Sequence, residues 1–357
     1  MKKRKKRNSK TNKKWIGGII AFTSIVVITL VIFKGIDIYR KASVPNVRIE
    51  NEKRTIKIKT GSDFRDVYRM LVKAEILIDT ADFSWMATKM NYVSHVKPGN
   101  YVIEDGMTNR ELIRMLRAGN QQPVKLMFHN ISTVEELAGT VANQIEADST
   151  EIVSLLYDKD FIESYGFSPE TIYALFIPNT YEFYWDTDAE EFIERMKTEH
   201  DRFWDKNRIK KLNELEMSEI EVSTLASIVD AETYMDDEMS AIAGVYLNRL
   251  EKGIRLQADP TIKFAVGNIH MRRVLRKHLS IDSPYNTYRN DGLPPGPIGI
   301  PSIAAIDAVL YAEDHEYIYF AAKPDFSGYH NFAKTLNQHL RNAREYQRAL
   351  NRQRIYK

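Results

Sequence analysis

The chain of 357 residues contains no cysteine, and its 51 Lys and Arg against 48 Asp and Glu give a formal net charge of +3. Without cysteine, disulfides, thiolate metal sites and a cysteine nucleophile are excluded. Nine of the cations and no acid lie in residues 1–14, which leaves residues 15–357 with a net charge of −6, so we expect no nucleic-acid partner.

The N-terminus has the pattern of a membrane anchor. Residues 15–33 are uncharged and rich in Ile and Val, and as a helix they span about 28 Å, close to the hydrocarbon thickness of a bilayer. A cleaved signal peptide is the alternative, but its apolar region is normally only about 7–15 residues long. We therefore predict a retained, single-pass transmembrane helix in the inner (cytoplasmic) membrane. The basic tail 1–14 is then cytoplasmic, and the chain after residue 33 lies on the outer (periplasmic) side.

A linker is predicted at residues 34–53, and a small compact module for binding or spacing at residues 54–128. Alternation of polar and apolar residues predicts its strands, and apolar residues at helical spacing predict its helices, with Ser62 and Thr108 as candidate N-caps. No constellation of reactive side chains occurs in this module. The predicted elements are a strand at 54–59, helices at 63–73 and 81–90, a strand at 101–103, a helix at 108–118 and a strand near 124–128.

A larger, mainly helical domain with one β-hairpin is predicted at residues 129–357, so the fold class is α+β. Residues 280–301 are dense in Pro, Gly, Asn and Tyr, which predicts a long ordered loop or a lid. A turn of Pro, Asp, Ser and Gly predicts the hairpin. The other predicted elements are helices at 188–204, from 218 through 232, at 237–250 and at 302–311, hairpin strands at 317–322 and 329–332, and a polar C-terminal helix.

Glu232 carries the clearest chemical signal in this domain. A helical period places it on one stripe with Val222, Leu225 and Val229, and a carboxylate on an apolar face loses hydration, which raises its pKa. An acid that keeps its proton near neutral pH is what cleavage of a glycosidic bond needs. Asp230 lies about 200° around the helix, on a different face. The alternative is a structural carboxylate paired with an arginine.

Four segments after residue 229 offer the amide, hydroxyl and aromatic groups that bind sugars. Asn286 has the alternative of capping backbone in a turn, and His330 that of a satisfied core histidine. Gln257 and Asp259 alternatively brace the loop before Pro260. No HExxH, G-x-S-x-G, P-loop or dinucleotide motif occurs, so we expect neither a metal nor a cofactor. The segments are 230–233, 248–249 with 256–261, 283–288 with 292–297, and 330–335 with His339.

Residues 225–346, about a third of the chain, resemble the catalytic part of the YceG-like family of endolytic murein transglycosylases. The family's layout of one N-terminal membrane helix and a LysM-like module also agrees with residues 15–33 and 54–128. Members often carry Glu-x-Glu-Thr where this chain has Asp230-Ala-Glu232-Thr233, so the first acid is shortened and the second is kept. The matching segments are LASIVDAET, AGVYLNRL, IRLQADPT, SPYNTYRNDGLPPGPIGIPS and GYHNFAKT.

The resemblance implies that Glu232 is catalytic and that the reaction is non-hydrolytic. Glu232 protonates the oxygen between N-acetylmuramic acid and N-acetylglucosamine, and its carboxylate then takes the proton of the muramoyl C6 hydroxyl, which attacks C1 and leaves a 1,6-anhydro end. The implied role is to terminate nascent peptidoglycan strands at the membrane, with penicillin-binding synthases as expected partners. We predict that the residues binding the glycan are Gln257, Asp259, Asn286, Tyr288 and His330.

Two alternatives remain open at this point. A hydrolytic muramidase would use water, with Asp230 or Asp259 as the second carboxylate, and its products would carry reducing ends. A non-catalytic, membrane-tethered scaffold would bind peptidoglycan without cleaving it, and its function would then depend on the small module and not on Glu232.

Overall fold

The computed structural model describes residues 9–271 and 273–353, so residues 1–8 of the predicted basic tail lie outside the described residues. The chain divides into two compact units. The first unit contains the chain up to Pro123 together with Tyr184–Asp186, and the second contains Val124–Phe183 and the chain from Thr187 onward. The first unit has one hydrophobic core, and the second unit has two.

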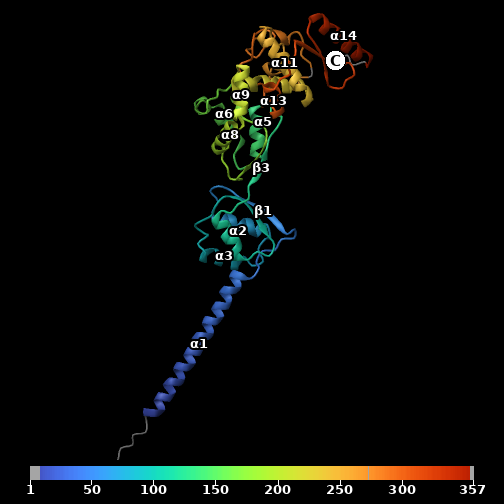
Figure 1. Ribbon diagram of the computed structural model, residues 1–357. Helices are drawn as coiled ribbons and strands as arrows, with labels where there is room; N and C mark the ends of the chain where they lie inside the picture. The colour runs from blue at the N-terminus through green and yellow to red at the C-terminus, as the bar shows by residue number, and fades with distance from the viewer. Residues whose placement is uncertain (1–8, 272, 354–357) are drawn as a thin grey trace, which may run out of the picture. The chain divides into compact units, whose positions relative to one another are not determined.

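The first unit begins with a long helix, α1 (Ser9–Ser43), which projects from the rest of that unit in Figure 1. By length and composition, the stretch Gly18–Ser43 can cross a membrane, and an 18-residue window within it has a mean hydropathy of 2.5. The large apolar side chains described between Trp15 and Tyr39 are exposed, as expected for a stretch of helix that is not covered by the protein itself. The helix does not stop at Phe33 but continues through the first part of the predicted linker.

The C-terminal end of α1 is fixed to the first unit by three kinds of contact. Ala42 is buried in the core of the unit. The Asn109 side-chain amide donates a hydrogen bond to the backbone carbonyl oxygen of Lys41 over 2.9 Å, and the Lys41 ammonium group lies 5.0 Å from the ring centre of Trp85. The helix and the small module are therefore one structural piece.

The rest of the first unit has the predicted strand–helix–helix–strand order, followed by a further helix. β1 and β2 pair antiparallel, with Arg54 opposite Ile103. The N-cap of α2 is Asp63 and not Ser62, because Asp63 and Asp66 each accept the backbone N–H of the other. The elements are β1 (Lys53–Ile58), α2 (Phe64–Lys73), α3 (Thr80–Lys89), β2 (Gly99–Glu104) and α4 (Asn109–Ala118), which Thr108 caps as predicted.

The first half of the second unit surrounds a core of its own. β3 was expected to close the small module, but it pairs antiparallel with β4, where Leu126 lies opposite Tyr181 and both side chains are buried in this core. β4 is not among the elements predicted from the sequence. The elements are β3 (Val124–Met127), α5 (Val134–Ala142), α6 (Ser149–Tyr157), α7 (Lys159–Ser164), η1 (Ile172–Leu175), β4 (Thr180–Phe183) and α8 (Ala189–Phe203).

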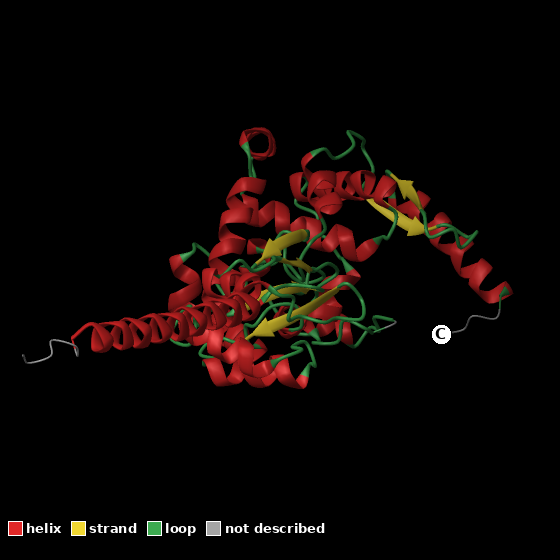
Figure 2. Ribbon diagram, turned by 90° about the horizontal axis from the view of Figure 1, so that it is seen from below, coloured by secondary structure: helices red, strands yellow, loops and turns green. Residues whose placement is uncertain are grey.

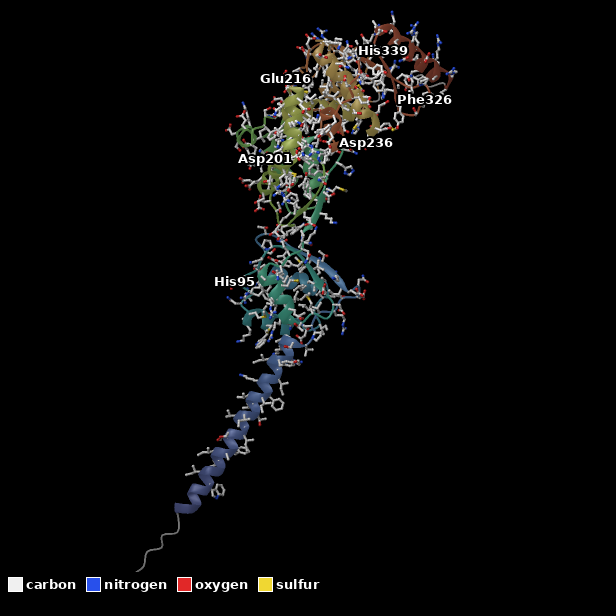
Figure 3. All side chains as sticks on the ribbon, in the orientation of Figure 1. His95, Asp201, Glu216, Asp236, Phe326 and His339 are labelled. Carbon is white, nitrogen blue, oxygen red and sulfur yellow. The ribbon has the colours of Figure 1, made fainter. Side chains whose placement is uncertain are left out.

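The second half of this unit contains the predicted hairpin, which lies beside the C-terminal helix in Figure 2. Phe326 in the hairpin turn, labelled in Figure 3, contacts Tyr346 of that helix with ring centroids 6.0 Å apart. α10, α11 and α13 supply most of the second core. The elements are α9 (Lys206–Leu215), α10 (Glu219–Glu232), α11 (Asp236–Glu251), α12 (Asp259–Ala265), η2 (His278–Ser280), α13 (Ile303–Leu310), β5 (Tyr319–Ala322), β6 (His330–Ala333) and α14 (Leu336–Arg352).

The long loop predicted at residues 280–301 is ordered by close backbone packing. A Cβ atom on Gly296 would overlap the backbone carbonyl oxygen of Glu170. We expect Gly296→Ala to lower the free energy of unfolding by about 1–3 kcal/mol, because the loop backbone must move. Urea unfolding of the full chain in detergent measures this.

Gly139→Ala is the matched control, since this residue lies within α5 and a Cβ there meets nothing within 4 Å. The control is expected to raise stability by about 0.5–1 kcal/mol, because alanine favours the helix. Equal stability of Gly296→Ala and the wild type would contradict the packing argument.

Candidate active site

α10 (Glu219–Glu232) forms as the sequence predicts and is anchored along one side. Ser218 caps its N-terminus, where the hydroxyl accepts a backbone N–H of the first turn. Val222, Leu225 and Val229, the three apolar residues of the predicted stripe, are fully buried. The stripe therefore fixes the rotation of the helix and the direction in which its last residue points.

Glu232 is that last residue, because Thr233 adopts an extended backbone with φ −144° and ψ 148°. The C-terminal end of a helix disfavours negative charge, since the peptide dipoles place their negative ends there. The side chain is half-buried, and its Oε1 accepts a hydrogen bond from the hydroxyl of Tyr246 over 2.7 Å. One carboxyl oxygen is thus held by the protein, which leaves the other for a ligand.

Burial raises the pKa of Glu232 to about 7, because the carboxylate loses hydration among the surrounding protein atoms. The hydrogen bond from Tyr246 stabilises the carboxylate and lowers this pKa. The negative charge of Asp259 raises it again, whereas the positive charges of Lys263 and Arg249 lower it. Near neutral pH, a large share of the Glu232 side chains therefore carries a proton that can be donated.

Tyr246 comes from α11 (Asp236–Glu251) and is almost fully buried, with 1% of its surface exposed. Its ring meets Phe320 of the hairpin edge to face, with centroids 5.8 Å apart. Tyr246 was not among the site residues predicted from the sequence. Its hydroxyl group has the role of positioning the acid.

Removal of this hydroxyl in Tyr246→Phe is expected to shift the alkaline limb of kcat/KM to higher pH. The lost hydrogen bond stabilises the carboxylate form by about 1 kcal/mol, which corresponds to somewhat less than one pH unit. The pH profile of strand cleavage, measured for the full chain in detergent, checks the shift. A limb that moves to lower pH would mean that the hydroxyl does not stabilise the charged acid.

Asp230 contacts a different neighbour, as its predicted position on another face requires. Its carboxylate accepts hydrogen bonds from the backbone N–H of Ser302 over 3.0 Å and from the Ser302 hydroxyl over 2.8 Å. Ser302 is also the N-cap of α13 (Ile303–Leu310). Burial raises the pKa of Asp230, while the bonds from Ser302 oppose the shift. Asp230 therefore connects α10 to the start of α13.

Arg249 is a buried cation near the acid, with 8% of its surface exposed. Its guanidinium group donates to the carbonyl oxygens of Ile318 over 2.6 Å and Leu256 over 2.7 Å, so it holds the start of the hairpin against the segment before α12. Burial lowers the pKa of Arg249. Its charge is close enough to Glu232 to favour the carboxylate form. Arg249 thus acts on the acid at a distance and does not form the ion pair with it that the structural alternative required.

Three of the predicted binding residues lie together beside α12 (Asp259–Ala265). The Tyr288 hydroxyl donates to the carboxylate of Asp259 over 2.7 Å. Gln257 has an exposed side chain and a left-handed backbone with φ 52°, which is uncommon for a residue other than glycine. Such strain is typical of functional sites. The charge of Asp259 reaches Glu232, so this group adjoins the acid.

The other two predicted binding residues are engaged by the protein itself. Asn286 is fully buried, and its amide donates to the carbonyl oxygens of Leu279 and Ile281, so it shapes the loop. His330 Nδ1 lies 2.7 Å from the carboxylate of Glu238 on α11. Both of these are the structural alternatives that the sequence left open.

A cavity of about 380 Å³ lies beside the last turns of α10, and Glu232 itself is not among the residues that line it. Ala231 and Tyr234, on either side of Glu232 in the chain, both line it. Within the part of the chain that the structure describes, no group of three or more His, Asp or Glu is placed to hold a metal ion. The lining residues are Asn130, Ile131, Ser132, Ser227, Asp230, Ala231, Tyr234, Pro260, Lys263, Phe264, Ile269, His270, Ile298, Gly299 and Ile300.

Comparisons with known proteins agree on one family. A sequence profile described as the YceG-like family matches residues 56–345. The endolytic murein transglycosylase of Bacillus subtilis is 29% identical over 319 residues, which cover 84% of this chain and 87% of that protein. A protein of the same name from Streptococcus pneumoniae is 28% identical over 325 residues, and these cover 82% of this chain but only 58% of the longer relative. The crystal structure of a YceG-like protein from Listeria monocytogenes is similar with a TM-score of 0.54 and 31% identity, covering 82% of this chain and 99% of that one.

Proposed function

Because the chain belongs to the YceG-like family, we propose that it is a peptidoglycan lytic transglycosylase, a lyase that cleaves glycan strands internally. The relatives named endolytic murein transglycosylase support this activity. The observation that carries the proposal is the position of Glu232, an acid with a pKa of about 7 that Tyr246 holds through one oxygen and whose chain neighbours Ala231 and Tyr234 line a cavity. A proton donor of this kind is what a glycosidic oxygen needs as a leaving group.

In the first step, Glu232 gives its proton to the oxygen between N-acetylmuramic acid and N-acetylglucosamine. The bond from the muramoyl C1 to this oxygen breaks, and positive charge develops at C1. The carboxylate that remains is stabilised by the Tyr246 hydroxyl and by the nearby charges of Arg249 and Lys263. These groups prepare Glu232 for its second role as a base.

In the second step, the Glu232 carboxylate removes the proton from the C6 hydroxyl of the same muramoyl residue. The hydroxyl oxygen attacks C1 and closes the 1,6-anhydro ring, which returns the proton to Glu232. No water is consumed, so one carboxyl group serves both steps. Gln257, Asp259 and Tyr288 are the groups beside α12 that we expect to bind the glycan.

A hydrolytic muramidase is the second candidate, and one observation favours it. Asp259 lies close enough to Glu232 to raise the pKa of Glu232, so a second carboxyl group is present that can activate a water molecule as a base. The hydrogen bond from Tyr288 already uses one oxygen of Asp259. Asp230, the other candidate for the second carboxylate, accepts two hydrogen bonds from Ser302.

We further propose that the enzyme is anchored by α1 with its N-terminus in the cytoplasm, so that the βααβ module and the second unit lie on the outer side of the cytoplasmic membrane. The apolar stretch of α1 and the basic residues before it support this orientation. An anchored enzyme reaches glycan near the membrane, where nascent strands emerge from penicillin-binding synthases. Termination of those strands is its proposed role, and the βααβ module is a LysM-like candidate for holding them.

End-group analysis of purified, uncrosslinked peptidoglycan strands tests the proposal. The full chain in detergent is expected to produce 1,6-anhydromuramoyl ends, which mass spectrometry separates from reducing ends because the two differ by one water. Reducing ends would establish the hydrolytic candidate instead, and Asp259→Asn should then abolish the cleavage. If neither anhydro ends nor reducing ends form on these strands, the protein is a scaffold and the enzymatic proposal fails.

A further inference from the structure

The cavity that Ala231 and Tyr234 line also contains a cation, Lys263, to which the reaction assigns no binding partner. Among the residues that line the cavity, two have a Lys, Arg, Asp or Glu side chain, namely Lys263 and Asp230. Asp230 accepts two hydrogen bonds from Ser302, so its carboxylate is occupied. Lys263 differs, because no carboxylate of residues 9–271 and 273–353 lies within ion-pair distance of its ammonium group. A half-buried lysine without an anion, in the wall of a cavity, is free to bind one.

The position of Lys263 on α12 places it near the acid. It lies four residues after Asp259, on the same face of the helix. The charges of both residues act on Glu232, in opposite directions. Lys263 therefore lies in the cavity wall and within electrostatic reach of Glu232.

An exposed aromatic ring borders the cavity on the chain segment that carries the acid. Tyr234 is 96% exposed, the highest value among the exposed large apolar side chains of the described residues. It lines the same cavity and follows Glu232 by two residues. A tyrosine combines an apolar face with a polar tip, and its ring offers a surface on which a sugar ring can stack.

We propose that Lys263 binds a carboxylate carried by the muramoyl residue at the cleaved bond, while Tyr234 supports its sugar ring. The inference rests on the proposed function and names the part of the substrate that enters this cavity. Muramic acid differs from glucosamine by a lactyl group, whose carboxyl end is either free or extended by a peptide that itself carries carboxylates. Glucosamine has no such anion. Lys263 therefore distinguishes the two alternating sugars and selects which of the two bonds is cleaved.

The test compares cleavage of strands with free carboxylates and of strands whose carboxylates have been converted to amides. Uncrosslinked strands with intact peptides probe the peptide carboxylates, and strands stripped of peptide by an amidase probe the lactyl carboxylate. For the wild-type chain in detergent, kcat/KM on one of these two preparations is expected to fall about tenfold or more upon amidation, as a charged hydrogen bond is lost. In Lys263→Gln, the ratio of kcat/KM on free strands to kcat/KM on amidated strands should approach one. Lys263→Arg should restore the wild-type ratio.

Lys210→Gln is the control, because this lysine on α9 is 78% exposed and outside the cavity. Its ratio should equal that of the wild type. The ratio also separates binding from the effect of the Lys263 charge on the Glu232 pKa, since that effect changes kcat/KM equally on free and amidated strands. The preparation that responds to amidation identifies the source of the carboxylate.

An equal ratio for the wild type and Lys263→Gln on both preparations would overturn the proposal, even if anhydro ends form normally. Failure of the proposed function gives a different result, because the wild-type chain would then form no anhydro ends on any preparation. The two failures are therefore distinguishable in one set of digests.

Discussion

Glu232→Gln is expected to lower kcat/KM for the formation of anhydro ends by about 10³–10⁴-fold. Glutamine keeps the shape of the side chain and can still accept the hydrogen bond of Tyr246, but it has no proton to give and cannot act as a base. Both chemical steps are then lost together. End-group analysis of strand digests measures the loss, and binding of the same strands should persist.

The pH dependence of the wild type completes this prediction. The acid form of Glu232 is present below its pKa, so kcat/KM should be high at pH 6 and fall as pH rises through about 7. Glu251→Gln is the matched control, because this residue ends α11 with a side chain that is 78% exposed. The control should show wild-type activity and the same pH profile. A Glu232→Gln variant that keeps more than about a tenth of the activity would exclude this residue as the acid.

The sequence predicted the elements whose patterns are local. The stripe of Val222, Leu225 and Val229 fixed α10 and the direction of Glu232, and the structure confirms that these three residues are buried. The hairpin and its adjacent C-terminal helix are also as predicted. Periodicity and capping residues reveal such elements because each depends on neighbours a few positions away.

The sequence did not reveal contacts between distant segments. β3 looked like part of the small module, and only its pairing with the four-residue β4 places it in the second unit. Asn286 has a side-chain amide of the kind that binds sugars, yet this amide donates its hydrogen bonds to the loop backbone. Tyr246 was not predicted as a site residue, because the sequence does not show which group the hydroxyl of a buried tyrosine contacts. Its spacing of three residues from Arg249 was the available signal, because both then lie on one side of α11.

Glu232→Gln is also expected to stabilise the protein, and by more at high pH. The pKa of Glu232 is about 7 in the folded protein against an ordinary value of 4.5. Between these values the folded state binds a proton that the unfolded chain has lost, so the free energy of unfolding of the wild type falls as pH rises across this window. The full difference is about 3 kcal/mol above pH 7, and it is absent below pH 4.5. Glutamine does not titrate, so the free energy of unfolding of the variant does not fall in this way as pH rises.

Urea unfolding of both proteins at pH 5 and pH 8, with hydrogen exchange of α10 amides to report on the second unit, measures the difference. The advantage of Glu232→Gln should be small at pH 5 and grow to about 1–3 kcal/mol at pH 8, while Glu251→Gln should show no such growth. An advantage that is independent of pH would mean that packing, and not the suppressed ionisation of the acid, distinguishes the variant. The pH-dependent result would tie the stability cost of this side chain to the same lost hydration that keeps its proton available for the leaving oxygen.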